Sequence, residues 1–146
     1  MTTNSTQLDG PRLPLWISIV VILGALLLTI GAVISKVAPL MLTNGGVMTI
    51  AVRVYADYTF ARDLPLAFML FLLLALKARR MLAGMMALVA LVQVLDLIND
   101  LARGEFLLVP ITLLLTVVFV AGASRLLGQS IWQVNAWREK DLPQSR

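Results

Sequence analysis

Residues 55–105 have the sequence YADYTFARDLPLAFMLFLLLALKARRMLAGMMALVALVQVLDLINDLARGE. Two long apolar runs are separated by the basic segment Lys77-Ala78-Arg79-Arg80. Each run reaches the roughly 20 residues that a helix needs to cross about 30 Å of hydrocarbon. The stretch therefore predicts a hairpin of two transmembrane helices joined by a short turn.

The composition of the whole chain agrees with a membrane protein. Of its 146 residues 60% are hydrophobic and 14% are charged, and the mean hydropathy is +0.91. A soluble domain has about 25% charged residues. The net charge of +4 comes from basic residues at the ends of the apolar runs. Anionic lipid and membrane topology explain that placement better than nucleic acid, which we do not expect as a partner.

The chain predicts an all-α fold, a four-helix transmembrane bundle with both termini in the cytoplasm. We expect a polar N-terminal tail (1–14), a membrane domain (15–128) and an interfacial C-terminal segment (129–146) with two tryptophans at headgroup depth. The spans are predicted at 15–35, 59–78, 81–102 and 106–127. Residues 47–58 favour a short interfacial helix that runs into the second span, and Pro65 then falls in the first two turns of that span.

The orientation follows from the basic residues, which favour the cytoplasmic side. If the turn between the second and third spans is cytoplasmic, eight basic residues lie inside and four outside. The inner set is Arg12, Lys77, Arg79, Arg80, Arg125, Arg138, Lys140 and Arg146, and the outer set is Lys36, Arg53, Arg62 and Arg103.

Several classes of chemistry are excluded, because the chain has no cysteine and no histidine. Disulfide exchange, thiolate metal sites and histidine-ligated haem or zinc all need one of these residues. We expect no metal site, and the sequence indicates no particular cofactor.

Polar residues inside the hairpin form the candidate site. Arg62 lies fifteen residues before Lys77, and Asp96 lies fifteen residues after Met81. At 1.5 Å per residue both lie about 22 Å from the turn, at matched height on neighbouring helices. We therefore predict an ion pair between Arg62 and Asp96, because charges at that depth are normally paired.

A wider cluster surrounds this pair. The spacing i, i+3, i+7 places three polar residues of the third span on one face. The predicted ligand-binding set, in a pocket that opens outward, is Arg62, Asp63, Gln93, Asp96 and Asp100. The alternative is that the helices reach the surface early and these residues only cap helix ends and extend to the headgroups.

Short motifs resemble those of DoxX-like small four-span membrane proteins. They are Ala38-Pro39 after the first span, Ala61-Arg62-Asp63-Leu64, the basic pair Arg79-Arg80, and Asp96. The resemblance covers residues 17–127, although Leu66-Ala67 stands where the family commonly has a glycine. The resemblance implies a four-helix bundle in a bacterial inner membrane. Some members of the family are accessory subunits of membrane redox systems.

These features favour a non-enzymatic, multi-pass membrane component. It would support other membrane subunits or bind a small amphipathic ligand. The first alternative is a membrane-embedded enzyme that uses Asp96 or Asp63 for acid–base chemistry and Arg62 as a clamp on a lipid-soluble substrate. The second alternative is a proton-coupled carrier of small molecules.

The orientation gives the first testable prediction. A reporter fused after residue 146 should report the cytoplasm, and reporters inserted at Gly45 or Gly104 should report the opposite side, because of the eight-to-four charge bias. A C-terminal reporter on the outside would contradict the charge argument.

Overall fold

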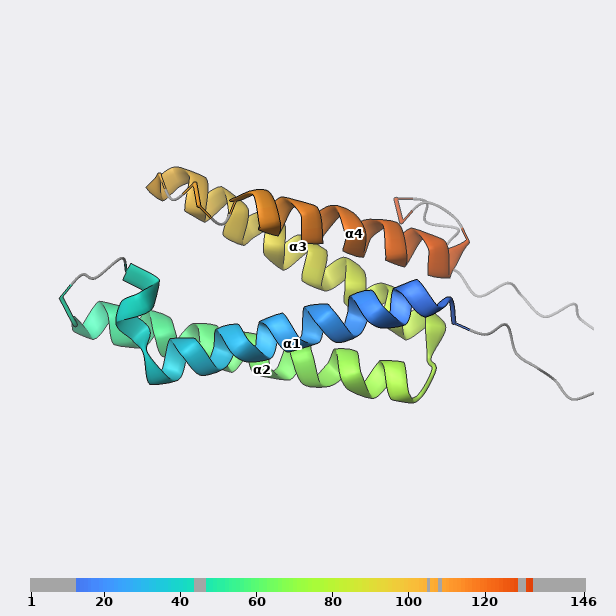
Figure 1. Cartoon of the computed structure of the whole chain (residues 1–146), viewed down its shortest axis with the longest axis horizontal. Helices are drawn as coiled ribbons and strands as arrows, with labels where there is room; N and C mark the ends of the chain where they lie inside the picture. The colour runs from blue at the N-terminus through green and yellow to red at the C-terminus, as the bar shows by residue number, and fades with distance from the viewer. Residues whose placement is uncertain (1–12, 44–46, 105, 108, 129–130, 133–146) are drawn as a thin grey trace, which may run out of the picture.

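The computed structural model describes residues 13–43, 47–104, 106–107, 109–128 and 131–132. This part of the chain contains no strand. It holds four α-helices and one 3-10 helix (Figure 1), namely α1 (Leu15–Val37), η1 (Pro39–Thr43), α2 (Ile50–Ala75), α3 (Arg79–Arg103) and α4 (Val109–Leu127). The predicted all-α fold with four helices is confirmed. The predicted N-terminal tail and C-terminal segment lie almost wholly outside the described residues.

Each of the four α-helices is long and apolar enough to cross a membrane. Large apolar side chains on their outer faces are mostly exposed, for example Ile19, Phe68 and Leu91. Exposure of such apolar faces to water would be unfavourable, whereas contact with lipid chains is favourable. The chain is therefore a multi-pass membrane protein with a bilayer as its environment.

Helix α2 is longer than the predicted span, because the expected interfacial helix and the span form one helix. The Thr49 hydroxyl caps its first turn by accepting a hydrogen bond from the Val52 N–H at 3.2 Å. Pro65 is thus the sixteenth residue of α2, and its predicted place in the first two turns of a helix is wrong. Since proline has no N–H, the Ala61 carbonyl lacks its usual partner in the helix.

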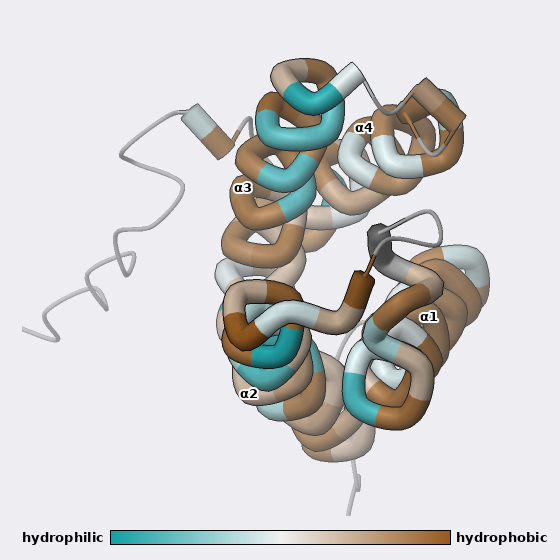
Figure 2. The backbone as a smooth tube through the Cα atoms, turned by 90° about the vertical axis from the view of Figure 1, so that its left-hand side faces the viewer, coloured by the Kyte–Doolittle hydropathy of each residue, from teal (hydrophilic) through white to brown (hydrophobic). Residues whose placement is uncertain are grey.

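The helices form two hairpins, α1 with α2 and α3 with α4, which diverge from one end of the bundle to the other (Figure 1). We call the end with the α2–α3 turn the turn end, and the opposite end the η1 end. The start of α1 and the end of α4 both lie at the turn end, as four spans require (Figure 1). Viewed from the η1 end, hydrophilic segments lie on α2 and α3 (Figure 2).

The apolar core fills the turn end. In α2 the buried apolar residues of this core lie between Ala67 and Leu73, and in α3 between Leu82 and Ala90. Phe119 of α4 is fully buried against them. Toward the η1 end the only buried residues of α2 are Ala56 and Asp63. The two hairpins are therefore held by apolar packing over one half of their length only.

Gly24 allows α1 to approach α4 at this core. A Cβ atom added at Gly24 would overlap the Phe119 ring, whereas one added at Gly31 would lie 3.9 Å from the nearest side-chain atom, Oδ2 of Asp63. Small residues at such points let membrane helices pack closely. The close packing of α1 on α4 therefore requires a glycine at position 24, whereas position 31 has space for a larger side chain.

The pair of glycines gives a matched prediction. Gly24→Ala should destabilise the protein by about 1–3 kcal/mol, the usual cost of overpacking. Gly31→Ala should be neutral or stabilising, since both variants gain the same helix propensity and only one creates a clash. The measurement is unfolding of each purified variant by titration of detergent micelles with SDS. Equal stability of the two variants would contradict the close packing of α1 on Phe119.

Candidate functional site

Arg62 lies at the middle of α2 and not near its end. It is the thirteenth of 26 residues, about 18 Å along the axis from Ile50. Asp96 lies in α3, seven residues before its last residue, Arg103. Arg62 therefore does not cap the start of α2, because more than three turns of the helix precede it.

Arg62 and Asp96 form a bidentate ion pair. The Arg62 Nη1 donates to Asp96 Oδ1 at 2.8 Å, and Nη2 donates to Oδ2 at 2.9 Å. The predicted pair and the matched height of the two residues are confirmed. Two parallel bonds between a planar guanidinium and a carboxylate are the strongest geometry open to such a pair. This contact joins the two hairpins directly beyond the apolar core.

Asp63 completes a cluster with one positive and two negative groups. Its Oδ1 accepts a hydrogen bond from the Arg62 Nε at 2.8 Å. The Asp63 side chain is 9% exposed, against 36% for Arg62 and 33% for Asp96. Its other oxygen, Oδ2, faces the open position at Gly31 of α1. The cluster, which we call the Arg62 cluster, has a formal charge of −1.

Gln93 and Asp100 have other partners. The Thr116 hydroxyl of α4 lies 3.3 Å from Gln93 Oε1 and 2.8 Å from the Thr112 carbonyl oxygen, and its single hydrogen can be donated to either acceptor. Asp100 pairs with Arg103 of its own helix at 2.7 Å. The structure thus brings Arg62, Asp63 and Asp96 together, and gives the other two predicted residues different hydrogen-bond and ion-pair partners. A role in ligand binding remains a prediction for all five.

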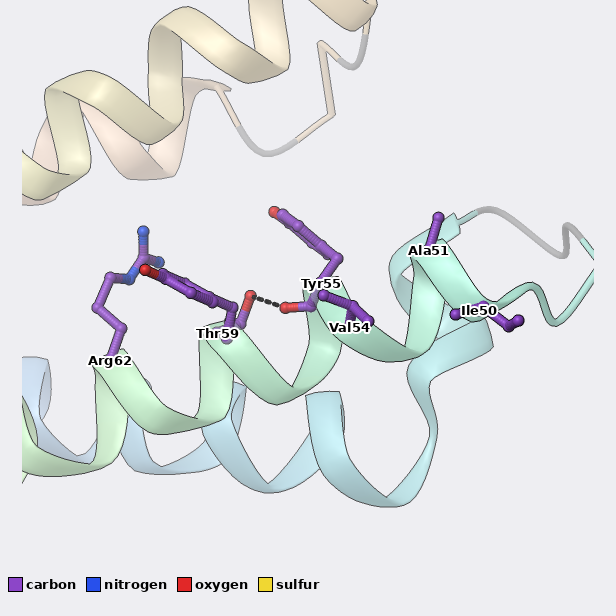
Figure 3. A pocket seen from close by; sticks show the side chains of 7 residues that line it. Ile50, Ala51, Val54, Tyr55, Thr59 and Arg62 are labelled. Carbon is purple, nitrogen blue, oxygen red and sulfur yellow. Dashed lines mark hydrogen bonds between the residues drawn. The ribbon is translucent and has the colours of Figure 1, made fainter.

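An open groove of about 590 Å³ runs along α2 and reaches the Arg62 cluster. We call it the Arg62 groove. Its described lining comes wholly from one face of α2, with Ile50, Ala51, Val54, Tyr55, Tyr58, Thr59 and Arg62. Figure 3 shows Arg62 and Tyr55 extending from α2 toward the side of α3. The lining is apolar and aromatic except at its end, where Thr59 and Arg62 lie.

Two further contacts fix the groove. The Arg103 guanidinium of α3 lies over the Tyr55 ring, 5.7 Å from its centre, which links α2 and α3 a second time. The Thr59 hydroxyl is turned back onto its own helix and donates to the Tyr55 carbonyl at 3.0 Å (Figure 3). The polar end of the groove is therefore the guanidinium of Arg62.

The sequence argument missed a second polar site at the η1 end. Arg53 and Asp57 are four residues apart in α2, a spacing that favours a pair within the helix. Asp57 instead pairs with Lys36 of α1, at 2.6 Å. This contact depends on the close packing of α1 on α2. Residue spacing within one helix could not predict it.

In a comparison with known proteins, no protein family, no curated protein and no solved structure matches the chain. The function must therefore be argued from the site.

The Arg62–Asp96 pair predicts a coupled effect on stability. Arg62→Ala and Asp96→Ala should each destabilise the protein in detergent, because each leaves a charge without its partner. The double variant should be less destabilised than the sum of the two by about 0.5–3 kcal/mol.

Asp100 supplies the control for this cycle, since it lies on the same helix and pairs with Arg103. The effects of Arg62→Ala and Asp100→Ala should add. SDS titration of the five variants and the wild type measures both cycles. Additive effects of Arg62→Ala and Asp96→Ala would show that the pair does not stabilise the protein.

Proposed function

We propose that this chain is a multi-pass protein of a bacterial inner membrane, of the DoxX-like kind, that binds a small amphipathic molecule with an uncharged polar head. The molecule would occupy the Arg62 groove, in the leaflet at the η1 end. The observation that carries the proposal is a largely apolar open groove of about 590 Å³ that ends at a fixed guanidinium. A few placed polar groups in an apolar cleft are typical of small-molecule sites.

The hydrogen bonds of Arg62 indicate which hydrogen-bonding groups the head of the ligand should carry. A guanidinium has five N–H donors, and three of them bind Asp63 and Asp96, which leaves two. Arginine accepts no hydrogen bond. The head should therefore carry an acceptor such as a ketone or ester carbonyl.

The charge of the cluster argues against an anionic head. Arg62 is already balanced by Asp63 and Asp96, so a carboxylate or phosphate would meet a formal charge of −1. Repulsion between like charges is strong where water is scarce. A neutral carbonyl meets no such repulsion and still accepts from the guanidinium.

The same pairing favours binding over acid–base catalysis. A general base must be free to take a proton from the substrate. Both carboxylates of the cluster are engaged by Arg62, at 2.8–2.9 Å. The cluster is better suited to hold a polar head than to exchange protons with it.

Photolabelling tests this function with two probes that share one acyl chain and differ in the head group. A photoreactive monoacylglycerol has a neutral ester head, and the photoreactive fatty acid with the same chain has an anionic head. We expect the monoacylglycerol to label α2 residues of the groove at least several-fold more than the fatty acid, as mapped by peptide mass spectrometry.

Two tryptophan variants of α2 supply the control. Val54→Trp should fill the groove and abolish the labelling, since Val54 lines it. Phe68→Trp should leave the labelling intact, because Phe68 is exposed on α2 away from the lining. Equal labelling by both probes, or labelling that Val54→Trp does not reduce, would refute the proposed function.

A further inference from the structure

A second cavity, of about 430 Å³, lies where the end of α1, η1 and the start of α2 meet. We call it the Lys36–Arg53 pocket. Its lining is partly polar and partly apolar, with Ser35, Lys36, Pro39, Met48, Arg53, Ala56 and Asp57. None of these residues lines the Arg62 groove. Because the ends of membrane-spanning helices lie near the lipid headgroups, we expect the pocket at that depth.

Two basic side chains and one acidic side chain give this pocket a formal charge of +1. Lys36 is held in place by Asp57, at 2.6 Å, and its Nζ lies 5.9 Å from the centre of the Phe60 ring. One ammonium N–H is thus engaged, and the other donors of Lys36 can serve a further acceptor. Asp57 fixes Lys36 without cancelling the second positive charge.

Arg53 supplies that second charge. It is an exposed residue of the first turn of α2, and its guanidinium makes no ion pair with any residue in the described ranges. Among the described residues none engages its five N–H donors in an ion pair, and these donors can serve a ligand. A planar guanidinium fork matches the oxygens of a phosphate in a bidentate way, and a neighbouring ammonium adds a point charge.

We propose that the Lys36–Arg53 pocket binds a phosphate-bearing anion, with Arg53 as the fork and Lys36 as the second cation. The charge sets it apart from the Arg62 cluster, since one site is formally +1 and the other −1. The apolar part of the lining, Pro39, Met48 and Ala56, suits a phosphate attached to an acyl glycerol. The phosphate of an anionic lipid and free inorganic phosphate share the chemistry that the pocket recognises.

The test uses the full-length protein in a neutral detergent and two probes. Native mass spectrometry and thermal unfolding are followed with added phosphatidylglycerol and, separately, with inorganic phosphate. We expect one or both to bind the wild type. Arg53→Gln should weaken binding about tenfold, as removal of a hydrogen bond between charged groups does. Arg53→Lys should retain part of the affinity, because it keeps the charge and loses the fork.

Arg80→Gln is the matched control. Arg80 is an exposed arginine of the turn end, so its substitution removes the same charge far from the pocket. It should leave the affinity unchanged. Binding of phosphatidylglycerol alone identifies a lipid headgroup, and binding of both probes identifies a site for any accessible phosphate. Phosphatidylcholine, whose head has no net charge, should bind more weakly than phosphatidylglycerol.

Three results would overturn the proposal. They are the absence of binding by both probes, an affinity that Arg53→Gln leaves unchanged, and an equal loss in Arg80→Gln and Arg53→Gln. The last result would mean attraction by net charge alone. Because Lys36 and Arg53 do not line the Arg62 groove, failure here leaves the photolabelling result untouched, and the two proposals can fail separately.

Discussion

The bidentate pair between Arg62 and Asp96 is the contact on which the arrangement of the two hairpins depends. In a bilayer, apolar surfaces gain little by leaving lipid for protein, so packing and polar contacts must hold helices together. Apolar packing holds the hairpins at the turn end, where Phe119 meets Gly24. From Ala67 of α2 and Ala90 of α3 toward the η1 end, that packing is absent, and the ion pair connects α2 with α3.

The same pair explains why the site lies where it does. A charge near the middle of α2 is tolerable only with a partner at the same height, and the short turn fixes which residue of α3 that is. Asp63, the next residue in the chain, then shares the guanidinium from the other side. The excess of one negative charge follows from this geometry, and it would disfavour a second anionic group beside Arg62.

Much of the fold and the central pair could be predicted from the sequence, because both follow from distance along a helix. Apolar run lengths give the spans, and equal counts from the turn give the height of Arg62 and Asp96. The rotation of α3 between α2 and α4 is not encoded by spacing. Gln93 and Asp96 share a helical face, yet Gln93 meets Thr116 of α4 and Asp96 meets α2. The pairing of Lys36 with Asp57 escaped prediction for the same reason, since it depends on how α1 rotates against α2.

Both cavities lie along the η1 half of α2, where the apolar core is absent. Ligand-binding regions are commonly drawn from the less stable parts of a structure, because a cavity and a close-packed core exclude each other. The turn half can supply the stability, since its helices interlock through Phe119 and Met86. In the η1 half, two faces of α2 then remain available for the two sites. On the side of α3, Arg62 belongs to a cluster of charge −1, and on the side of α1 the start of α2 helps to form a pocket of charge +1. Opposite charge on the two faces would keep anionic lipid heads on the α1 side and leave the Arg62 groove to neutral molecules.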